Sequence, residues 1–397
     1  MGTKAVHTAD AKALIKNNIR NYSMFLMLAL IMVIFAFLTG GINLSPHNVT
    51  NIFFHNSHVL ILAIGMVQVI IVKGIDLSVG SVCAFVGALS AMLYNTGIGM
   101  PITLAASILM GMAIGAWHGL WVAYAKLPAF IVTLAGMLLF RGLTYIVTQV
   151  RPIIIDGNYA RLATGILDEA LGWGRIGPYF PAPIILAFML IALLLAVELL
   201  GRRTKIANGF EVTPLPLFAA KLALVSLLIL ALADRFARFR GLPIVMIVLG
   251  ITVFVFHFIL KHTVLGRYIY AVGGNDRSAK LSGINSEFVT FLVFVIMGSL
   301  TGLAAVISTG IMNTALPQAG MLFELDAIAA CYIGGVSAAG GIGSVIGVVV
   351  GGLVMGAINN GMSLMFLGTH HQHVVKALIL LLAVFYDIYT RRKAGLG

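Results

Sequence analysis

Long apolar runs recur along the whole chain, and each is close to the length that an α-helix needs to cross a lipid bilayer. Residues 243–260 and 288–311 contain no Asp, Glu, Lys or Arg. A bilayer core requires about 20 predominantly apolar residues in one helix. With 60% hydrophobic and only 10% charged residues, the chain cannot fold as a soluble domain without exposing a large apolar surface. These runs predict an all-α, polytopic transmembrane helical bundle.

About twelve helical spans are expected. The weakest is the run at 214–233, because Lys221 lies within it. In chain order the expected spans are residues 23–38, 58–72, 77–93, 101–124, 129–149, 182–200, 214–233, 243–260, 288–311, 326–338, 342–366 and 374–389. The 44 glycines agree with this class, since small residues let transmembrane helices approach closely.

The basic residues give these spans an orientation. Residues 1–22 carry four Lys or Arg and one acid, and the tail 391–397 begins with three basic residues. Loops on the cytoplasmic side carry an excess of Lys and Arg, so both termini are predicted to be cytoplasmic. The net charge of +12 is thereby assigned to topology and membrane lipid, not to nucleic acid.

Two halves of the chain have a similar order of spans. Residues 58–149 and 288–389 each hold four expected helices, with Asp76 and Asp326 each near the start of the second one. Seven spans separate the first helices of the two halves, so the halves are oppositely oriented. This order predicts an inverted repeat with a pathway near the repeat interface. Residues 202–241 are interpreted as an added helical pair outside the repeats.

Three charged positions, Asp76, Arg141 and Asp326, are candidates for a role in the pathway. Asp76 is expected to cap the helix that follows it; alternatively, the surrounding KGIDLSVGS sequence interrupts a helix near the pathway, with Ser78 facing it. Arg141 lies deep in a predicted span, where a charge costs about 2.5–3.5 kcal/mol on insertion scales. We expect Arg141 to hold carbonyls or a carboxylate inside the bundle; direct contact with a solute is the alternative.

The most polar segment between two apolar ones is residues 261–287. Gly273 and Gly274 are expected to break the helix before them, with Gly274 in a backbone conformation that a β-branched residue cannot adopt. Asn275 or Asp276 can then cap a short helix over residues 277–282, which Gly283 ends. This helix offers apolar contacts and positive charge, which docking to a soluble partner would use. The apolar residues are Ala279 and Leu281, and the basic ones are Arg277 and Lys280. An ordinary basic loop is the alternative.

This segment carries a family resemblance. Its sequence, YAVGGN at 270–275 followed by AKLSGI at 279–284, resembles the cytoplasmic coupling loop of sugar-importing ABC permeases of the ribose, xylose and multiple-monosaccharide group. The KGIDLSVGS stretch at 73–81 and the FELDAIAA stretch at 323–330, which glycine pairs follow, are also similar to that family. NNGMS at 359–363 resembles the multiple-monosaccharide branch most closely. The resemblance extends over residues 50–390.

The resemblance implies a function and a set of partners. The chain would be the permease subunit of a bacterial inner-membrane importer with a fold similar to type II ABC importers, translocating xylose, glucose, galactose or a similar monosaccharide. Separate ATP-binding subunits, a periplasmic sugar-binding protein and a second permease copy are implied, and no cofactor. The alternative is an ion-coupled secondary transporter, which usually needs carboxylates buried at mid-membrane. The acids of this chain are expected at span ends or in loops.

Motifs of enzyme chemistry are not found. The sequence contains no G-x-S-x-G, H-E-x-x-H or G-x-x-x-x-G-K-[ST], so no catalytic residue is assigned. His370, His371 and His373 are read as a solvated turn, with a weak metal site as the alternative. Polar residues at plausible positions along a pathway, each equally explained as a bond between helices, are Gln68, Ser78, Ser81, Asn313, Asn359 and Asn360.

Overall fold

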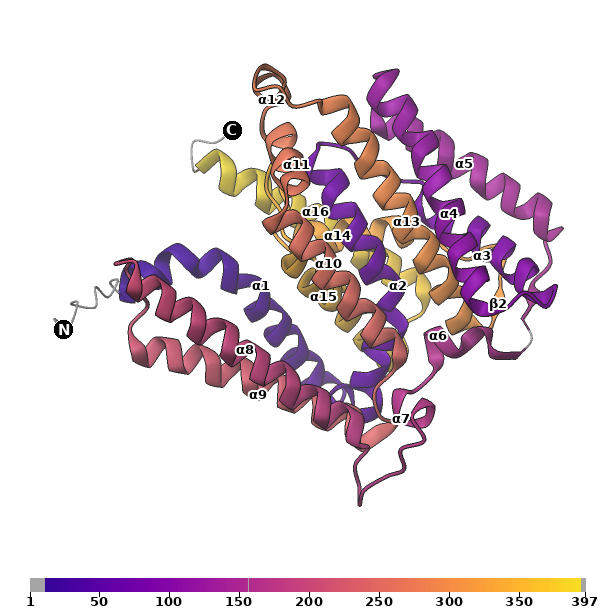
Figure 1. Ribbon diagram of the computed structural model, residues 1–397. Coiled ribbons are helices and arrows are strands. Elements are labelled where there is room, and N and C mark those ends of the chain that lie inside the picture. Colours follow the sequence, from indigo (N-terminus) through magenta and orange to yellow (C-terminus); the bar gives the residue numbers. More distant parts are fainter. Residues whose placement is uncertain (1–10, 156, 394–397) are drawn as a thin grey trace. The chain divides into compact units, whose positions relative to one another are not determined.

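The computed structural model describes residues 11–155 and 157–393, which form α-helices with two short strands (Figure 1). This confirms the predicted all-α class. The N-terminal residues 1–10 and the last residues 394–397, both predicted to be cytoplasmic, lie outside the described part. The chain divides into two compact units, which we take one at a time. Unit 1 contains residues 166–242 with 44–50 and the chain up to 26; unit 2 contains residues 27–43, 51–165 and 243 onward.

Unit 1 is built around an antiparallel pair of long helices, α8 (Pro181–Ala207) and α9 (Leu215–Phe239). The buried carboxylate of Asp168, in the short helix α7 (Leu167–Ala170), accepts hydrogen bonds from the backbone N–H groups of Ala182 and Leu242 (2.8 and 3.0 Å). One acid thereby fixes the chain entering α8 and the chain leaving α9. Residues 202–241, predicted to form an added helical pair, contain the end of α8 and the whole of α9, and α8 itself begins at Pro181.

Lys221, which weakened the prediction of a span, is neutralised within this helical pair. Its ammonium group forms an ion pair with Glu198 of α8. Arg202, near the end of α8, stacks over the Phe218 ring at 4.9 Å. The two basic side chains therefore lie against partners on the neighbouring helix, and α9 is apolar enough to cross a membrane.

Unit 2 holds most of the remaining helices. α1 and α2 each have residues in both units. The bounds are α1 (Ala11–Leu38), α2 (Pro46–Ile71), α3 (Val79–Asn95), α4 (Met100–Gly119), the π-helical turn η2 (Leu120–Tyr124), α5 (Ala129–Thr148), α6 (Arg161–Thr164), α10 (Ile244–His262), α11 (Val264–Gly274), α12 (Asp276–Leu281), α13 (Ser286–Met312), α14 (Phe323–Ile333), α15 (Val345–Leu364) and α16 (Thr369–Lys393), with 3₁₀ turns η1 (Ile42–Leu44) and η3 (Gly157–Ala160).

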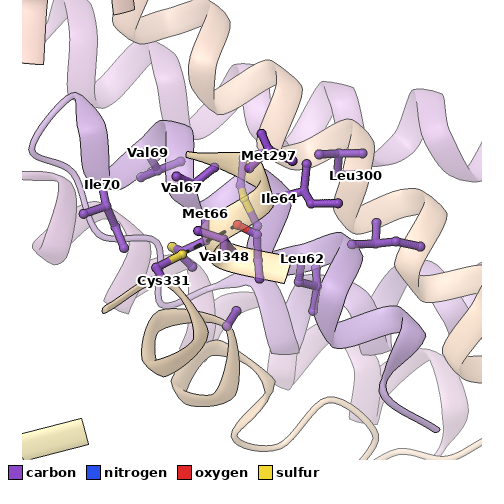
Figure 2. Close-up of a cluster of buried hydrophobic side chains, with 14 of the residues drawn as sticks. Leu62, Ile64, Met66, Val67, Val69, Ile70, Met297, Leu300, Cys331 and Val348 are labelled. Carbon is purple, nitrogen blue, oxygen red and sulfur yellow. Dashed lines mark hydrogen bonds between the residues drawn. The ribbon is translucent and has the colours of Figure 1, made fainter. Parts of the chain in front are cut away.

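The second half of α2 forms the centre of unit 2. Side chains on every face of this helix are buried, as expected for a helix that is apolar all round. Figure 2 shows Leu62 to Ile70 packed among Met297 and Leu300 of α13, Cys331 of α14 and Val348 of α15. Helix α2, from the first predicted repeat, and the other three helices, from the second predicted repeat, therefore share one core.

Most of the expected spans correspond to helices of sufficient length and hydropathy. Within the described residues, eight helices are long and apolar enough to cross a membrane, and shorter apolar helices cover Met24–Leu38, Val79–Asn95 and Thr369–Phe385. The second helix begins at Pro46 rather than at residue 58, so residues expected to precede the second span are helical.

The expected span at 326–338 does not form. Its place is taken by α14, whose 11 residues extend over about 16 Å, roughly half the thickness of a bilayer core. The helix ends before Gly334 and Gly335, and Gly335 has a φ of +82°. Hydropathy predicted a continuous span here because the glycines that end the helix are compatible with an apolar run.

The chain nevertheless passes from one end of unit 2 to the other between residues 313 and 341. At one end, β2 (Thr314–Ala315) pairs antiparallel with β1 (Ile153–Ile154) beside the ends of α3 and α5. At the other end, the N–H of Gly341 donates to the carbonyl of Ile71, the last residue of α2 (2.9 Å). Non-helical residues and the short helix α14 together carry the chain between these two ends.

Helices α4 and α13 are joined by close backbone contact. A Cβ atom at Gly298 would overlap the carbonyl oxygen of Gly111, and one at Gly302 would overlap the carbonyl oxygen of Ser107. Such contacts let dispersion forces act between helices for which lipid supplies no hydrophobic driving force. This is the close approach that the glycine content predicted.

The α4–α13 contact leads to a prediction about stability. Gly298→Ala places a methyl group against a backbone carbonyl that cannot rotate away, so we expect the free energy of unfolding to fall by about 1–3 kcal/mol. Gly250→Ala is the matched control, because it adds the same methyl group to helix α10 with no atom within 4 Å. Thermal unfolding in detergent measures both variants. Equal stability of the two would contradict the packing argument.

Candidate functional site

Two non-helical segments meet inside unit 2. One is residues 73–78, between α2 and α3; the other is residues 316–322, before α14. They are in backbone contact where Gly80, in the first turn of α3, meets Gly320, since a Cβ atom at either glycine would overlap the carbonyl oxygen of the other. We call the meeting of these segments the crossing. Non-helical backbone at membrane depth is tolerated where it is buried in protein or lines a cavity, so the crossing is the first candidate site.

Asp76 holds the first of these segments in shape. Its buried Oδ1 accepts hydrogen bonds from the backbone N–H (2.8 Å) and the hydroxyl (2.6 Å) of Ser78. Ser78 precedes α3 as its N-cap residue, but its own side chain makes no cap bond to the helix. The expected cap is therefore a turn closed by Asp76 just before the helix, and Ser78 is used in that turn. The alternative prediction, an interrupted chain near the pathway, also describes the backbone here.

Arg141 of α5 holds the second segment. Its Nη1 donates to the carbonyl oxygens of Pro317 (3.2 Å) and Ala319 (2.7 Å). Both carbonyls belong to residues outside any helix, where backbone acceptors lack an intrahelical partner. The expectation that Arg141 binds carbonyls within the bundle is confirmed.

Glu324 is a site residue that the sequence reasoning did not single out. Its buried side chain lies at the crossing, because its Oε2 occupies the space that a Cβ atom at Gly80 would need. The preceding residue, Phe323, lies against the buried ring of His58 on α2, with ring centroids 4.4 Å apart. An acid in the first turn of a helix is a common stabilising feature, so its position in the sequence gave no separate signal.

Asp326 lies one half-turn further along α14 and is paired. Its Oδ2 is 2.9 Å from the Nζ atom of Lys376 on α16, and both side chains are largely buried. Its Oδ1 is buried without a hydrogen-bond partner among the described residues. Sequence reasoning missed Lys376, although a lone Lys inside a predicted span is a signal that it needs an acid.

Asp76 and Asp326 therefore have different structural roles. Asp76 closes a turn before its helix, whereas Asp326 lies in the first turn of α14 and binds another helix. The helix contacts of the two halves correspond more closely than the two aspartates do. In each half the second helix packs against the fourth, which is α3 against α5 in the first half and α14 against α16 in the second. The inverted repeat stays a prediction, which superposing the two halves would test.

The other polar candidates are dispersed. Ser81 is buried in the first turn of α3, beside Gly80. Gln68 is buried on α2 and donates to the Ile64 carbonyl (3.2 Å), whereas Asn313 ends α13 with a φ of +51°. Asn359 and Asn360 lie toward the end of α15, where the Asn359 carbonyl accepts a bond from Ser363. The structure shows no hydrogen bond from Asn359 to the crossing.

The second candidate site is the segment at 261–287, where α11 and α12 form. Asn275 caps α12, as predicted, by accepting a hydrogen bond from the Ser278 N–H (3.1 Å), and Gly283 follows the helix with a φ of +82°. Gly273 and Gly274 do not break a helix; they are the last residues of α11. The expectation for Gly274 is wrong, because its φ is not positive and no atom lies within 4 Å of an added Cβ. The backbone turns at Asn275.

One face of α12 is exposed. Leu281 is 84% exposed, and Arg277, one turn earlier, is exposed and forms no ion pair with the described residues. Ala279 is buried, so it supports the helix from within instead of offering the expected contact. Arg277 and Leu281 are four residues apart and lie on the same side of the helix. They form the surface that we call the α12 face.

Ion pairs fix α12 to the start of α13. Lys280 is 2.8 Å from Glu287 and 3.2 Å from Asp276, and the bond to Glu287 raises the pKa of Lys280 above its ordinary value. Lys126, in the loop before α5, lies 3.8 Å from Glu287. A cavity of about 240 Å³ lies among these charged groups. The loop before α5 thus meets the segment at 261–287, which resembles a cytoplasmic coupling loop, at one end of unit 2.

Metal-binding geometry is not formed by the described residues. They contain no group of three His, Cys, Asp or Glu that could hold a metal ion. His370 and His371 have ring centroids 4.1 Å apart, in the first turn of α16 and not in the expected loop.

The contacts of Arg141 predict how its loss acts. Arg141→Leu removes a charge that is costly in a membrane, so the amount of protein in the membrane should be unchanged or higher. The Pro317 and Ala319 carbonyls lose their donor, and we expect the free energy of unfolding to fall by about 1–3 kcal/mol. Arg151→Leu, at an exposed arginine, is the control. Equal thermal stability of the two variants in detergent would mean that Arg141 does not hold the segment.

The Asp326–Lys376 pair predicts strong coupling between two helices. Lys376→Met leaves Asp326 buried without its partner and should destabilise the protein by about 3–5 kcal/mol. The double variant with Asp326→Leu removes both charges and should recover most of this loss. A double-mutant cycle of unfolding free energies measures the coupling. Additive effects of the two substitutions would refute the pairing.

Comparisons with known proteins agree with this arrangement. The family model described as branched-chain amino acid transport system / permease component matches residues 48–208 and 162–384. The chain is 38% identical to the xylose transport system permease protein of Haemophilus influenzae, over 95% of this chain and 98% of that protein. It is 38% identical to the xylose permease of Escherichia coli, over 94% of each chain, and 34% identical to the ribose import permease of Escherichia coli, over 86% and 85%. No solved structure matches the chain. The chain belongs to this family of multi-pass membrane permeases, as its resemblance to the sugar-importing ABC permeases indicated.

Proposed function

We propose that this permease is the membrane subunit of a bacterial ABC importer for monosaccharides, with xylose as the first substrate to test and glucose or galactose as related ones. The observation that carries the proposal is 38% identity to a xylose permease over nearly the full length of both chains. As a permease it is a transport component and not an enzyme. Its helices and their hydropathy fit a multi-pass protein of the inner membrane.

The interior of unit 2 fits the passage of a neutral polyol. Asp76 and Asp326 are engaged with Ser78 and Lys376, and Arg141 binds backbone carbonyls. These charged groups are already occupied and do not form a strong anion or cation site. A neutral sugar needs hydrogen-bonding groups along its route, and tight binding midway would slow its release.

A cavity at the opposite end from α12 supports an entrance there. It measures about 490 Å³ and is lined by Asn95, Gln149 and Arg151 among others, at the ends of α3 and α5. Asparagine, glutamine and arginine side chains can bond the hydroxyl groups of a sugar. We place the periplasmic mouth at this end, where a sugar-binding protein would deliver its ligand.

The α12 face is proposed to dock an ATP-binding subunit. Its exposed Arg277 and Leu281 offer one charge and one apolar side chain, the combination that a groove with an acidic rim would accept. We propose that α12 lies in the cytoplasm and, from the basic residues of the two terminal segments, that both termini do as well. We further propose that two copies of the permease form one transporter in the inner membrane, surrounded by lipid and without nucleic acid or cofactor.

An ion-coupled transporter is the second candidate. Glu324 and Asp326 lie in the first turn of α14, at a helix end as expected, but their side chains are buried in unit 2. Buried carboxylates are the feature that ion-coupled carriers use. The pairing of Asp326 with Lys376 and the similarity to sugar permeases favour ATP-driven import.

Reconstituted vesicles distinguish the two functions. Vesicles containing the permease, its ATP-binding subunits and the sugar-binding protein should accumulate labelled xylose only when ATP is present on the side of the ATP-binding subunits. Uptake driven by a proton or sodium gradient without those subunits would reject the proposal in favour of the second candidate.

Association of the ATP-binding subunits with the permease tests the α12 face. Arg277→Glu combined with Leu281→Ser should leave the amount of permease unchanged and reduce co-purification of the ATP-binding subunits about tenfold, since hot-spot side chains at interfaces contribute about 1–2 kcal/mol or more. Arg151→Glu makes the same charge reversal at the opposite end and should not affect co-purification. Normal association of the double variant would show that the partner binds elsewhere.

A further inference from the structure

Three chain segments meet at Gly273 without any side chain between them. A Cβ atom at Gly273 would overlap the carbonyl oxygen of Ile71 and lie 2.9 Å from the backbone nitrogen of Gly341. The Ile71 carbonyl, which ends α2, accepts its hydrogen bond from Gly341 N–H (2.9 Å). The end of α11 therefore rests directly on the bond that joins α2 to the turn between α14 and α15. We call this contact the glycine junction.

Two polar bonds fix the junction from its sides. The Tyr270 hydroxyl, one turn before the glycines on α11, donates to the Gly343 carbonyl (2.7 Å). The Lys73 ammonium lies 3.4 Å from the Gly274 carbonyl. Helix α11 is thus bonded to both segments that it touches, and each bond spans a large distance in the sequence.

Both of these segments lead along the chain to the crossing. From Ile71 the chain runs through residues 73–78 to Gly80, a distance of at most about 32 Å for nine extended residues. From Gly341 the chain runs back through α14 to Glu324 and Gly320. The helical part of this path is α14, whose 11 residues are about 16 Å long. The junction is therefore connected to each side of the Gly80–Gly320 contact by one continuous stretch of chain, through residues 73–78 on one side and through α14 on the other.

We propose that Gly273 is a positioning residue that transmits movement of α11 and α12 to the crossing. This rests on the proposed function, in which an ATP-binding subunit moves the α12 face. Backbone atoms in direct contact have no side-chain rotamers that could absorb a displacement, and packed interfaces shift as units. A movement of α11 then displaces Ile71 and Gly341 together and changes how the two non-helical segments meet.

The adjacent glycines supply a matched pair of variants. Gly273 is buried at the junction, whereas Gly274 is exposed and has no atom within 4 Å of an added Cβ. Both lie at the end of the same helix with φ values that are not positive, so alanine has similar intrinsic effects at both. Tyr270→Phe is a milder third variant, because it removes the bond to Gly343 and leaves the aromatic ring in place.

The experiment measures xylose uptake and ATP hydrolysis in the reconstituted complex. We expect Gly273→Ala to retain its ATP-binding subunits and hydrolyse ATP while the sugar transported per ATP falls about fivefold or more, the lower range of coupling between two sites. Tyr270→Phe should lower the same ratio by a smaller factor, and Gly274→Ala should leave it unchanged. If Gly273→Ala does not fold, Tyr270→Phe compared with Gly274→Ala decides the question.

Other outcomes overturn the inference. An unchanged ratio in Gly273→Ala, or in a folded Tyr270→Phe when the alanine variant is lost, would show that the junction transmits nothing. Loss of the ATP-binding subunits in step with uptake would show that Gly273 shapes the docking surface instead. If the unmodified complex shows no ATP-dependent uptake, the proposed function fails first, and the inference fails with it.

Discussion

Direct contact between backbones at glycine is the interaction on which unit 2 depends. Apolar side chains gain little by leaving lipid for another helix, so helices in a membrane are held by close packing and hydrogen bonds. Gly298 packs on Gly111, Gly320 on Gly80, and Gly273 on Ile71. Each contact joins segments that are far apart in the sequence. They occur along the helix pair α4–α13, at the crossing and at the α12 end, so one kind of contact fixes the core, the non-helical segments and the end of α11 that precedes α12.

Much of the fold could be predicted because hydropathy and length determine where a helix can cross a bilayer. The prediction failed where the backbone leaves the helix inside an apolar run. At α14 the residues on both sides of Gly334 and Gly335 are apolar, and only the positive φ of Gly335 shows that the helix has ended. At α2 hydropathy missed the start of the helix, because the polar residues after Pro46 form its first turns. Hydropathy reports the preferred environment of side chains and does not report the path of the backbone.

The candidate site divides in the same way between local and distant interactions. Asn275 and Gly283 could be predicted because capping involves residues only a few positions apart. The cost of burying Arg141 could also be predicted, but its carbonyl partners could not, since they lie more than 170 residues away. Gly274 was wrongly favoured over Gly273 because the need for glycine arises from Ile71 and Gly341, which a local pattern does not reveal. Lys376 and Glu324 were missed for the same reason.

The buried charges of unit 2 have a common physical role. Non-helical backbone in a membrane leaves donors and acceptors unpaired, and each such group costs free energy unless a partner is found. Asp76 binds the residues before α3, and Arg141 binds the residues before α14, so each charge stabilises one of the two segments that form the crossing. Asp326 and Lys376 fix the short helix that follows. Glu324 differs, because it lies at the Gly80–Gly320 contact and forms no salt bridge with the described residues. The charges that support the crossing are therefore separate from the one acid placed where the two segments touch.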